Sequence, residues 1–315
     1  MPQPVIKLPF FKIKNNSVFY LGNYRYLSLK GTRPGSQLRS KVLFDEGILI
    51  LKKPIEKGKK IRERILVVEP HLDDFALSAS GYALSALAKG ASISVLNIFS
   101  KTSIKKFPWR RQADISEDRY EKLRIEESLI AVEGYLGEKF QSWGLASLSL
   151  GENSETFPKS YRQDKLINNL AKRLAQEISA GKIDTVLCPM AVQGHIDHSV
   201  AFDAAIKAFR SSKRPFKLIL YEDMPYARNK IAFFDRLKQI KKQVALEDFY
   251  IPTDEYLGIM ADLIIIYRSQ FDDVNRQQML AIIKEDFRAA ASGQRYGNIK
   301  TTEFSQHYFI IKSKK

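Results

Sequence analysis

The sequence predicts a Rossmann-like α/β fold with a mainly parallel, doubly wound sheet. Short apolar runs alternate with longer segments of helical periodicity through most of the chain. Two of these runs, residues 65–68 and 184–190, end abruptly in segments that contain both His and Asp. Because ligands of such sheets bind beyond the carboxyl ends of the strands, these two turns are the first candidates for a functional site.

The composition fits a globular protein of this class. The 315 residues are 44% hydrophobic and 27% charged, and a chain of this length can bury a substantial core. The first 20 residues lack the unbroken apolar run of a signal peptide, and no stretch approaches the roughly 18 apolar residues of a membrane span. We therefore expect a cytoplasmic protein without a transmembrane segment. The single cysteine, Cys188, lies in an apolar run and is expected to be a buried thiol.

The pattern of the first 60 residues predicts β-hairpins. Alternating segments at 17–20, 42–44 and 48–51 are separated by turn residues. These strands are too short to bury a core alone. We therefore expect residues 1–60 to form a basic, β-rich extension packed on a main domain of residues 61–315.

In the main domain, the sequence predicts strands that alternate with helices, followed by a mostly helical C-terminal part. Strands are expected at 65–68, 92–99, 184–190, 217–221 and 308–311. Helices are expected at 76–89, 116–136, 161–180, 198–208, 229–245, 254–269 and 274–291. The polar segment 101–113 is long enough to be a substrate loop or lid, and residues 140–158 are expected to be irregular.

The formal net charge of +16 is concentrated at the start of the chain. Residues 1–64 contain 15 Lys or Arg against four acidic residues, a balance of +11. One interpretation is a surface that binds a polyanion, such as nucleic acid, an anionic membrane or an anionic glycan. The other interpretation is a solvated basic face without a specific partner.

Histidine is scarce in this chain, and its placement carries the chemistry. Three of the four histidines, His71, His195 and His198, lie in the two turns that follow the buried strands 65–68 and 184–190. Each turn also contains Asp. Two imidazoles and a carboxylate around an open position are the usual ligands of a catalytic zinc ion, which lowers the pKa of its bound water to about 7.

The two turns resemble the paired signature of a known family. The segments His71-Leu72-Asp73-Asp74 and Gly194-His195-Ile196-Asp197-His198 are similar to those of the PIG-L (LmbE-like) zinc deacetylases, which remove N-acyl groups from N-acetylglucosamine-type sugars. The helix motif Arg124-x-x-Glu127 and the segment 267–270 also resemble family elements. This resemblance implies an N-acyl sugar or glycoconjugate as the substrate. It also implies Zn²⁺, or another divalent metal such as Fe²⁺, as the cofactor.

The resemblance also implies a role for each residue of the motifs. His71, Asp74 and His198 would bind the metal. Asp73 would be the general base, and His195 would stabilise the oxyanion of the tetrahedral intermediate. Asp197 would orient an imidazole, and its alternative is an N-cap for the following helix.

Two further residues are expected to bind substrate. Arg124 would hold a substrate hydroxyl or phosphate, with an Arg124–Glu127 pair inside one helix as the alternative. Glu222, which follows the strand 217–221, is the second candidate. The oligomeric state stays open.

The first motif departs from the family pattern His-Pro-Asp-Asp-Glu at several positions. Leu72 replaces the Pro, Phe75 the Glu and Ser80 the first Gly of a later pair. These departures concern the pocket shape and hence the substrate. Two alternatives to a sugar deacetylase stay open: a polyanion-binding protein on an inactive hydrolase scaffold, and a metal-dependent amidase acting on a non-sugar conjugate.

Overall fold

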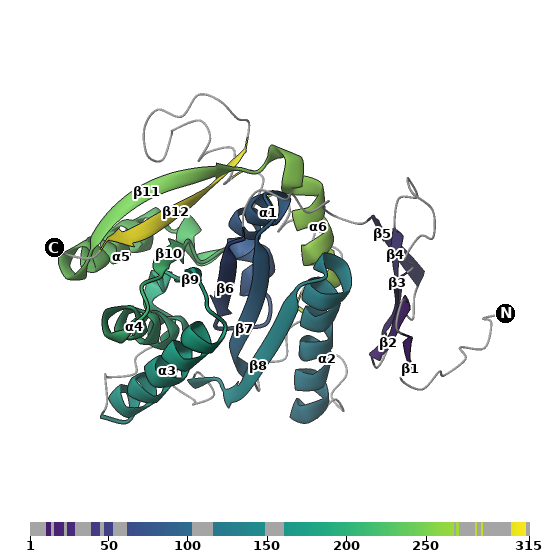
Figure 1. Cartoon of the computed structure of the whole chain (residues 1–315), viewed down its shortest axis with the longest axis horizontal. Coiled ribbons are helices and arrows are strands. Elements are labelled where there is room, and N and C mark those ends of the chain that lie inside the picture. Colours follow the sequence, from purple (N-terminus) through teal and green to yellow (C-terminus); the bar gives the residue numbers. More distant parts are fainter. Residues whose placement is uncertain are drawn as a thin grey trace.

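The computed structural model describes residues 62–102, 116–148, 161–267, 269–270 and 304–312, the strands between 11 and 52, and positions 281 and 285. It contains a seven-stranded sheet in the order β11-β12-β10-β9-β6-β7-β8 (Figure 1). The five strands from β10 to β8 are parallel, whereas β12 and β11 are antiparallel to their neighbours. The predicted α/β fold with a mainly parallel sheet is therefore confirmed.

The centre of the sheet is built from the apolar runs. The parallel strands are β6 (Arg64–Glu69), β7 (Ser92–Lys101), β8 (Lys139–Ala146), β9 (Thr185–Pro189) and β10 (Lys217–Tyr221). Every residue of β9 is buried, as are residues 65–69 of β6. Cys188 lies in β9 with none of its surface exposed, as predicted, and burial raises the pKa of its thiol. Strands covered on both faces read as continuous apolar runs, which is why the sequence located them.

Helices connect the parallel strands and cover both faces of the sheet. The connecting helices are α1 (Ser80–Ala88), α2 (Glu117–Leu129), α3 (Tyr161–Ala180) and α4 (Ile196–Ser211). One π-helical segment, Phe75–Ala79, precedes α1, and another, Ile130–Leu136, follows α2. From β6 the chain proceeds through β7 to β8 on one side, then returns to β9 on the other. Because the crossovers of parallel strands are right-handed, this reversal places α1 and α2 on one face and the adjacent α3 and α4 on the other (Figure 1).

The C-terminal part adds two helices and an antiparallel edge. These elements are α5 (Lys230–Gln243), β11 (Ala245–Pro252), α6 (Leu257–Ile266) and β12 (Ser305–Lys312). Two sequence predictions were wrong at the sheet edges. Residues 139–146 form strand β8 and not an irregular segment, and residues 245–252 form a strand that was not predicted. Both are edge strands with alternately half-exposed residues, so neither shows the apolar run of a central strand.

Several predicted features fall outside the described residues. These are most of the polar loop 101–113 and the helix 274–291. The predicted N-terminal strands at 17–20, 42–44 and 48–51 are present as β2 (Asn16–Leu21), β4 (Arg39–Phe44) and β5 (Gly47–Lys52). Two strands that were not predicted, β1 (Phe11–Ile13) and β3 (Tyr24–Ser28), lie beside them. They pair in sequence order into an antiparallel sheet, separate in its hydrogen bonding from the central sheet. The domain boundary at residue 60 stays a prediction.

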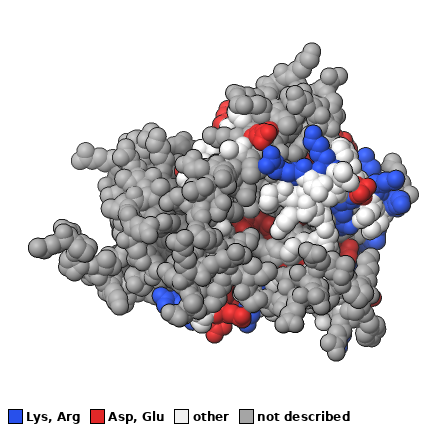
Figure 2. Space-filling model, turned by 180° about the vertical axis from the view of Figure 1, so that it is seen from behind, with Lys and Arg blue, Asp and Glu red and all other residues white. Residues whose placement is uncertain are grey.

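The charge of the first 64 residues lies mostly on side chains outside the described part, so polyanion binding also stays a prediction. On the surface that is described, Lys and Arg gather at one end of the face seen in Figure 2. None of the helices in the described segments has both the length and the apolar character required to cross a bilayer.

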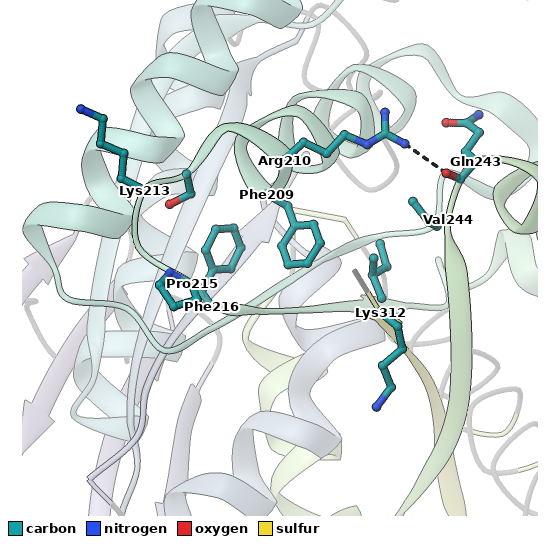
Figure 3. Close-up of a pocket in the computed structure, with 10 residues that line it drawn as sticks. Phe209, Arg210, Lys213, Pro215, Phe216, Gln243, Val244 and Lys312 are labelled. Atoms are coloured by element: carbon teal, nitrogen blue, oxygen red, sulfur yellow. Dashed lines mark hydrogen bonds between the residues drawn. The ribbon is translucent and has the colours of Figure 1, made fainter. Parts of the chain in front are cut away.

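A pocket of about 580 Å³ lies at the amino edge of the sheet (Figure 3). It is lined by Phe209, Arg210, Ser212, Lys213, Pro215, Phe216, Gln243, Val244, Ile311 and Lys312. Two of its cations, Arg210 and Lys213, lie at or just beyond the end of α4, and Arg210 donates a hydrogen bond to the Gln243 carbonyl at the end of α5. Positive charge at a helix C-terminus offsets the helix dipole, which accounts for this placement. The 16 residues of α4 span about 24 Å, so the pocket is remote from the motif that begins the same helix.

Candidate metal centre

The two His- and Asp-containing turns meet at the point where the strand order reverses. One turn follows β6 and the other follows β9, and these strands are hydrogen-bonded neighbours. A crevice forms at such a switch point because the connections leave the two strands toward opposite faces of the sheet. The tertiary structure thus brings together residues separated by more than 120 positions.

The first turn is organised by short-range hydrogen bonds. Pro70 ends the strand, and its carbonyl accepts hydrogen bonds from Phe99 N and Asn97 Nδ2 of β7. The Asp73 backbone N–H donates to the His71 carbonyl at 2.9 Å. The Asp74 carboxylate accepts a hydrogen bond from the His71 backbone N–H at 2.8 Å. These bonds turn the His71 and Asp74 side chains toward the same side of the turn.

The second turn leads directly into α4. His195 occupies the N-cap position of α4, and His198 lies three residues further on. Residues three apart share one face of a helix, so both imidazoles project toward the first turn. Their rings lie 4.9 Å and 5.0 Å from the His71 ring, measured between centroids. Potential ligand atoms of the three imidazoles lie within 4.8 Å of one another.

A tighter triangle of donor atoms is formed by His71, Asp74 and His198. His198 Nε2 lies 3.2 Å from His71 Nδ1 and 3.5 Å from Asp74 Oδ2, and the remaining edge measures 3.9 Å. Ligands bound tetrahedrally at about 2.0–2.1 Å from zinc are separated by about 3.3–3.4 Å. The three residues therefore fit a single small metal ion with little rearrangement.

In both His71 and His198, the ring nitrogen that faces away from the triangle contacts a buried carboxylate. His71 Nε2 lies 2.9 Å from Asp197 Oδ2, and His198 Nδ1 lies 2.5 Å from Asp223 Oδ1. Such carboxylates select the tautomer that leaves the other ring nitrogen available as a metal ligand. The nitrogens left over, His71 Nδ1 and His198 Nε2, are the two that form the triangle with Asp74.

The electrostatics of the cluster also favour a cation. Four aspartates, Asp73, Asp74, Asp197 and Asp223, are at most 7% exposed. Burial raises the pKa of Asp74, although the nearby His198 and His71 oppose this shift. Burial lowers the pKa of His198, but the charges of Asp74 and Asp223 outweigh it and raise that pKa to about 9. Buried negative charge is costly unless it is paired, and a bound cation supplies that pairing.

Asp197 and Asp223 also fix the loops around the site. The Asp197 carboxylate accepts hydrogen bonds from Ser147 Oγ at 2.6 Å and Leu148 N at 2.8 Å, beyond the end of β8. The hydrogen bond and charge of His71, together with these two contacts, outweigh the effect of burial and lower the pKa of Asp197. The N-cap alternative for Asp197 is wrong, because His195 occupies the cap position. The second oxygen of Asp223 accepts the Val192 N–H at 3.1 Å.

The two residues expected to bind substrate have different surroundings. Arg124 is 4% exposed, and its Nη2 lies 3.8 Å from Asp73 Oδ1, so the fold brings it to the centre as expected. Its Nε is buried without a hydrogen-bond partner among the described residues. The Glu222 carboxylate, by contrast, lies 2.6 Å from Nδ1 of His307, the fourth histidine, in β12. Substrate binding by either residue stays a prediction.

The helix motif Arg124-x-x-Glu127 is hydrogen-bonded to the segment 267–270. The Glu127 carboxylate accepts hydrogen bonds from the backbone N–H and the hydroxyl group of Ser269. Gln270 Nε2 donates to the Tyr120 hydroxyl group at 3.2 Å. Thus α2, which carries Arg124, is anchored to the segment that follows α6.

Sequence reasoning gave no role to three residues at the centre. Asp223 was visible as an acid after a buried strand, which was the same signal that singled out the two motifs. Tyr226 lies with its ring 6.1 Å from that of His195 and 5.8 Å from that of His198, and no sequence pattern indicated this contact. Glu69, the last residue of β6, is completely buried, and burial raises its pKa well above the usual value.

Comparison with known proteins agrees with the motifs. A model of the PIG-L family, described as GlcNAc-PI de-N-acetylase, matches residues 66–209. The chain is 30% identical over 217 residues to 2'-N-acetylparomamine deacetylase from Streptomyces fradiae, covering 67% of this chain and 75% of that protein.

Solved structures share the fold at lower identity. A zinc-inhibited form of teicoplanin deacetylase matches with a TM-score of 0.60 and 18% identity, over 79% of this chain and 97% of that one. The N,N'-diacetylchitobiose deacetylase from Pyrococcus horikoshii matches with a TM-score of 0.51 and 15% identity, over 79% of this chain and 83% of that one. From the paired motifs, the family match and the curated relative together, the chain belongs to the PIG-L (LmbE-like) family of deacetylases.

Proposed function

We propose that this protein is a metal-dependent hydrolase that removes the N-acetyl group from an N-acetylglucosamine-type sugar or glycoconjugate. The observation that carries the proposal is the triangle of His71 Nδ1, Asp74 Oδ2 and His198 Nε2, with edges of 3.2–3.9 Å. The acidic neighbour Asp73 adds a base beside it. Relatives named for N-acetylated amino sugars support the choice of substrate class.

His71, Asp74 and His198 would hold the metal. A bound divalent ion supplies a polarised water molecule of lowered pKa and an electrophile for the amide oxygen. Because the three donor atoms surround one position, we propose a single divalent ion at this centre and leave open whether it is Zn²⁺ or Fe²⁺. One ion beside a carboxylate suits amide hydrolysis, whereas phosphoester cleavage often uses paired metals.

Asp73 is proposed as the general base. Its carboxylate precedes that of the proposed ligand Asp74 by one position in the turn, and 7% of the residue's surface is exposed to solvent. It would take a proton from the attacking water and later deliver one to the leaving amine. The guanidinium group of Arg124, 3.8 Å from Asp73 Oδ1, would hold this carboxylate in position or bind a hydroxyl group of the sugar.

His195 is proposed to stabilise the developing oxyanion. It lies on the same helix face as His198, with ring centroids 5.2 Å apart, but it is outside the triangle of closest donor atoms. An imidazole placed there can donate an N–H to the carbonyl oxygen as negative charge develops on it. Asp197 would orient His71, and Asp223 would orient His198.

Substitution of Asp73 by Asn tests the assignment. We expect the N-acetyl hydrolysis rate of the D73N variant to fall by about 10²- to 10⁴-fold, because the general base is lost. The metal content should stay at one ion per chain, because Asn replaces no ligand. Release of free amine from a panel of N-acetylated sugars and non-sugar amides measures both activity and substrate class.

A matched control is Asp235, an exposed aspartate of α5, whose D235N variant should keep full activity. Absence of bound metal in unchelated wild-type protein would contradict the proposal. Hydrolysis of non-sugar amides alone would favour the amidase alternative.

A further inference from the structure

Glu69 is a buried carboxyl group at the carboxyl end of β6, and the proposed chemistry does not use it. Its Oε2 accepts a hydrogen bond from the backbone N–H of Phe75 at 3.0 Å. Since the two residues are six positions apart, this bond closes a loop over the whole first turn. His71, Asp73 and Asp74 all lie inside this loop.

Phe75 begins a helical segment whose cap is unusual. The first N–H groups of a helix lack partners within the helix and are normally satisfied by an Asp, Asn, Ser or Thr side chain at the N-cap. Here the N-cap residue is Asp74, yet its side chain makes no capping hydrogen bond. Its carboxylate instead accepts from His71 N and lies 3.5 Å from His198 Nε2.

The structure assigns to Glu69 the role of a positioning residue that takes over helix capping from Asp74. Glu69 satisfies a helix N–H from the preceding strand, so the Asp74 carboxylate is left to face the two histidines. Without this substitute acceptor, the Asp74 side chain would be drawn toward the N–H groups of its own helix. The inference rests on the proposed metal site, since it concerns the orientation of a proposed ligand.

The surroundings of Glu69 argue against a role in stability alone. Residues 65–68 before it are apolar and buried, and an apolar side chain would continue this pattern at no desolvation cost. The other carboxyl oxygen, Oε1, is buried without a hydrogen-bond partner among the described residues. A buried polar atom of this kind lowers stability. The favourable effect of Glu69 is therefore its hydrogen bond to the Phe75 N–H at the start of the helix.

Two substitutions separate the hydrogen bond from the charge. The E69Q variant keeps a carbonyl oxygen that can accept from Phe75 N, whereas E69L fills the space without an acceptor. We expect E69L to lower the affinity for Zn²⁺ by about 10- to 100-fold, as for other residues that orient metal ligands. The Zn²⁺ affinity of the E69Q variant should stay within about threefold of the wild-type affinity, a much smaller change than that expected for E69L. Competition with a chelating dye measures both affinities.

Glu138 offers a matched control elsewhere in the fold. It is also a buried glutamate, and its Oε2 accepts a backbone hydrogen bond from Ile93 at 2.7 Å, at the amino edge of the sheet. The E138L variant should lose stability without a change in Zn²⁺ affinity. Equal losses of affinity in E138L and E69L would overturn the inference, because both would then reflect general loosening. Wild-type affinity in E69L would also overturn it.

Hydrogen exchange provides a readout that does not depend on metal. In metal-free protein, the backbone amides of residues 71–77 should exchange faster in E69L than in wild type, E69Q or E138L. Unchanged exchange in E69L would contradict the role of Glu69 even if metal binding were affected. If the wild type bound no metal at all, the proposed function would fail, and the exchange experiment would still decide whether Glu69 orders the turn.

Discussion

The two turns that form the metal centre are held in place by different means. The turn after β6 has two hydrogen bonds within a span of seven residues, donated by the Phe75 N–H to Glu69 and by the His71 N–H to Asp74. The turn after β9 depends on distant partners, since Asp223 binds both His198 and the Val192 N–H. The first turn therefore has local hydrogen bonds of its own in addition to the contacts of Pro70 with β7 and of His71 with Asp197, whereas the second turn depends mainly on the rest of the fold.

The backbone shows the same difference. Between β9 and α4, Ala191, Gln193 and Gly194 adopt positive φ values of 61°, 63° and 71°. Residues other than glycine rarely adopt this conformation, so the loop is strained. No residue of the first turn has a positive φ. Long-range contacts stabilise the second turn against this strain.

The largest expected effect is the loss of a proposed ligand. Zinc-binding free energies of about 10–16 kcal/mol, shared among three or four ligands, make each ligand worth several kcal/mol. Either D74A or H198A should therefore lower Zn²⁺ affinity by about 10²- to 10³-fold, whichever turn carries the ligand. Isothermal titration calorimetry of both variants, with D235A as the control, measures the losses. A tenfold difference between D74A and H198A would show that the turns contribute unequally to binding.

The partners of the histidines should have a smaller effect. Loss of a carboxylate behind a metal-bound imidazole costs about 10- to 100-fold in affinity. We expect this loss in D197A and in D223A. The D223A variant should also increase hydrogen exchange at Val192, because Asp223 accepts that N–H. An unchanged exchange rate there would contradict the view that Asp223 positions the second turn.

Removal of the metal should affect the two turns differently. A ligand that binds only the folded protein stabilises it, by about 2.7 kcal/mol at a concentration 100 times its dissociation constant. Chelation should therefore lower the Tm. It should increase hydrogen exchange more in residues 190–198 than in residues 69–77, because the first turn keeps its local hydrogen bonds. The reverse order would refute the comparison.

The smallest expected effect comes from backbone strain at Gln193, which is exposed and has a φ of 63°. Glycine adopts this conformation freely, whereas a residue with a Cβ atom pays about 1–2 kcal/mol. Glycine therefore relieves the strain in the folded protein, but its greater flexibility in the unfolded chain offsets part of the stability gained. We therefore expect Q193G to be more stable than Q193A by about 1 kcal/mol in urea denaturation. Equal stabilities would show that the loop is not strained at this position.

The sequence by itself determined the central strands and the residue types of the site. Buried parallel strands are continuous apolar runs, and polar residues after them can be read without a structure. For this reason residues 65–68, 184–190 and 217–221 were predicted as strands, and His71, His195 and His198 were grouped with the aspartates of their turns before any distance was known. The family motifs added the expected roles.

Only the tertiary structure decided which partners complete the centre. The edge strands β8 and β11 were missed because half-exposed strands lack a distinctive apolar pattern, and β8 leads to the Ser147 hydroxyl that holds Asp197. From other parts of the fold, Asp223 and Tyr226 reach the histidines and Arg124 reaches Asp73. Their contacts arise because parallel strands end at one edge of the sheet, whatever their separation along the chain. A local sequence pattern indicates burial and periodicity. Which distant segments lie side by side is decided only when the sheet folds.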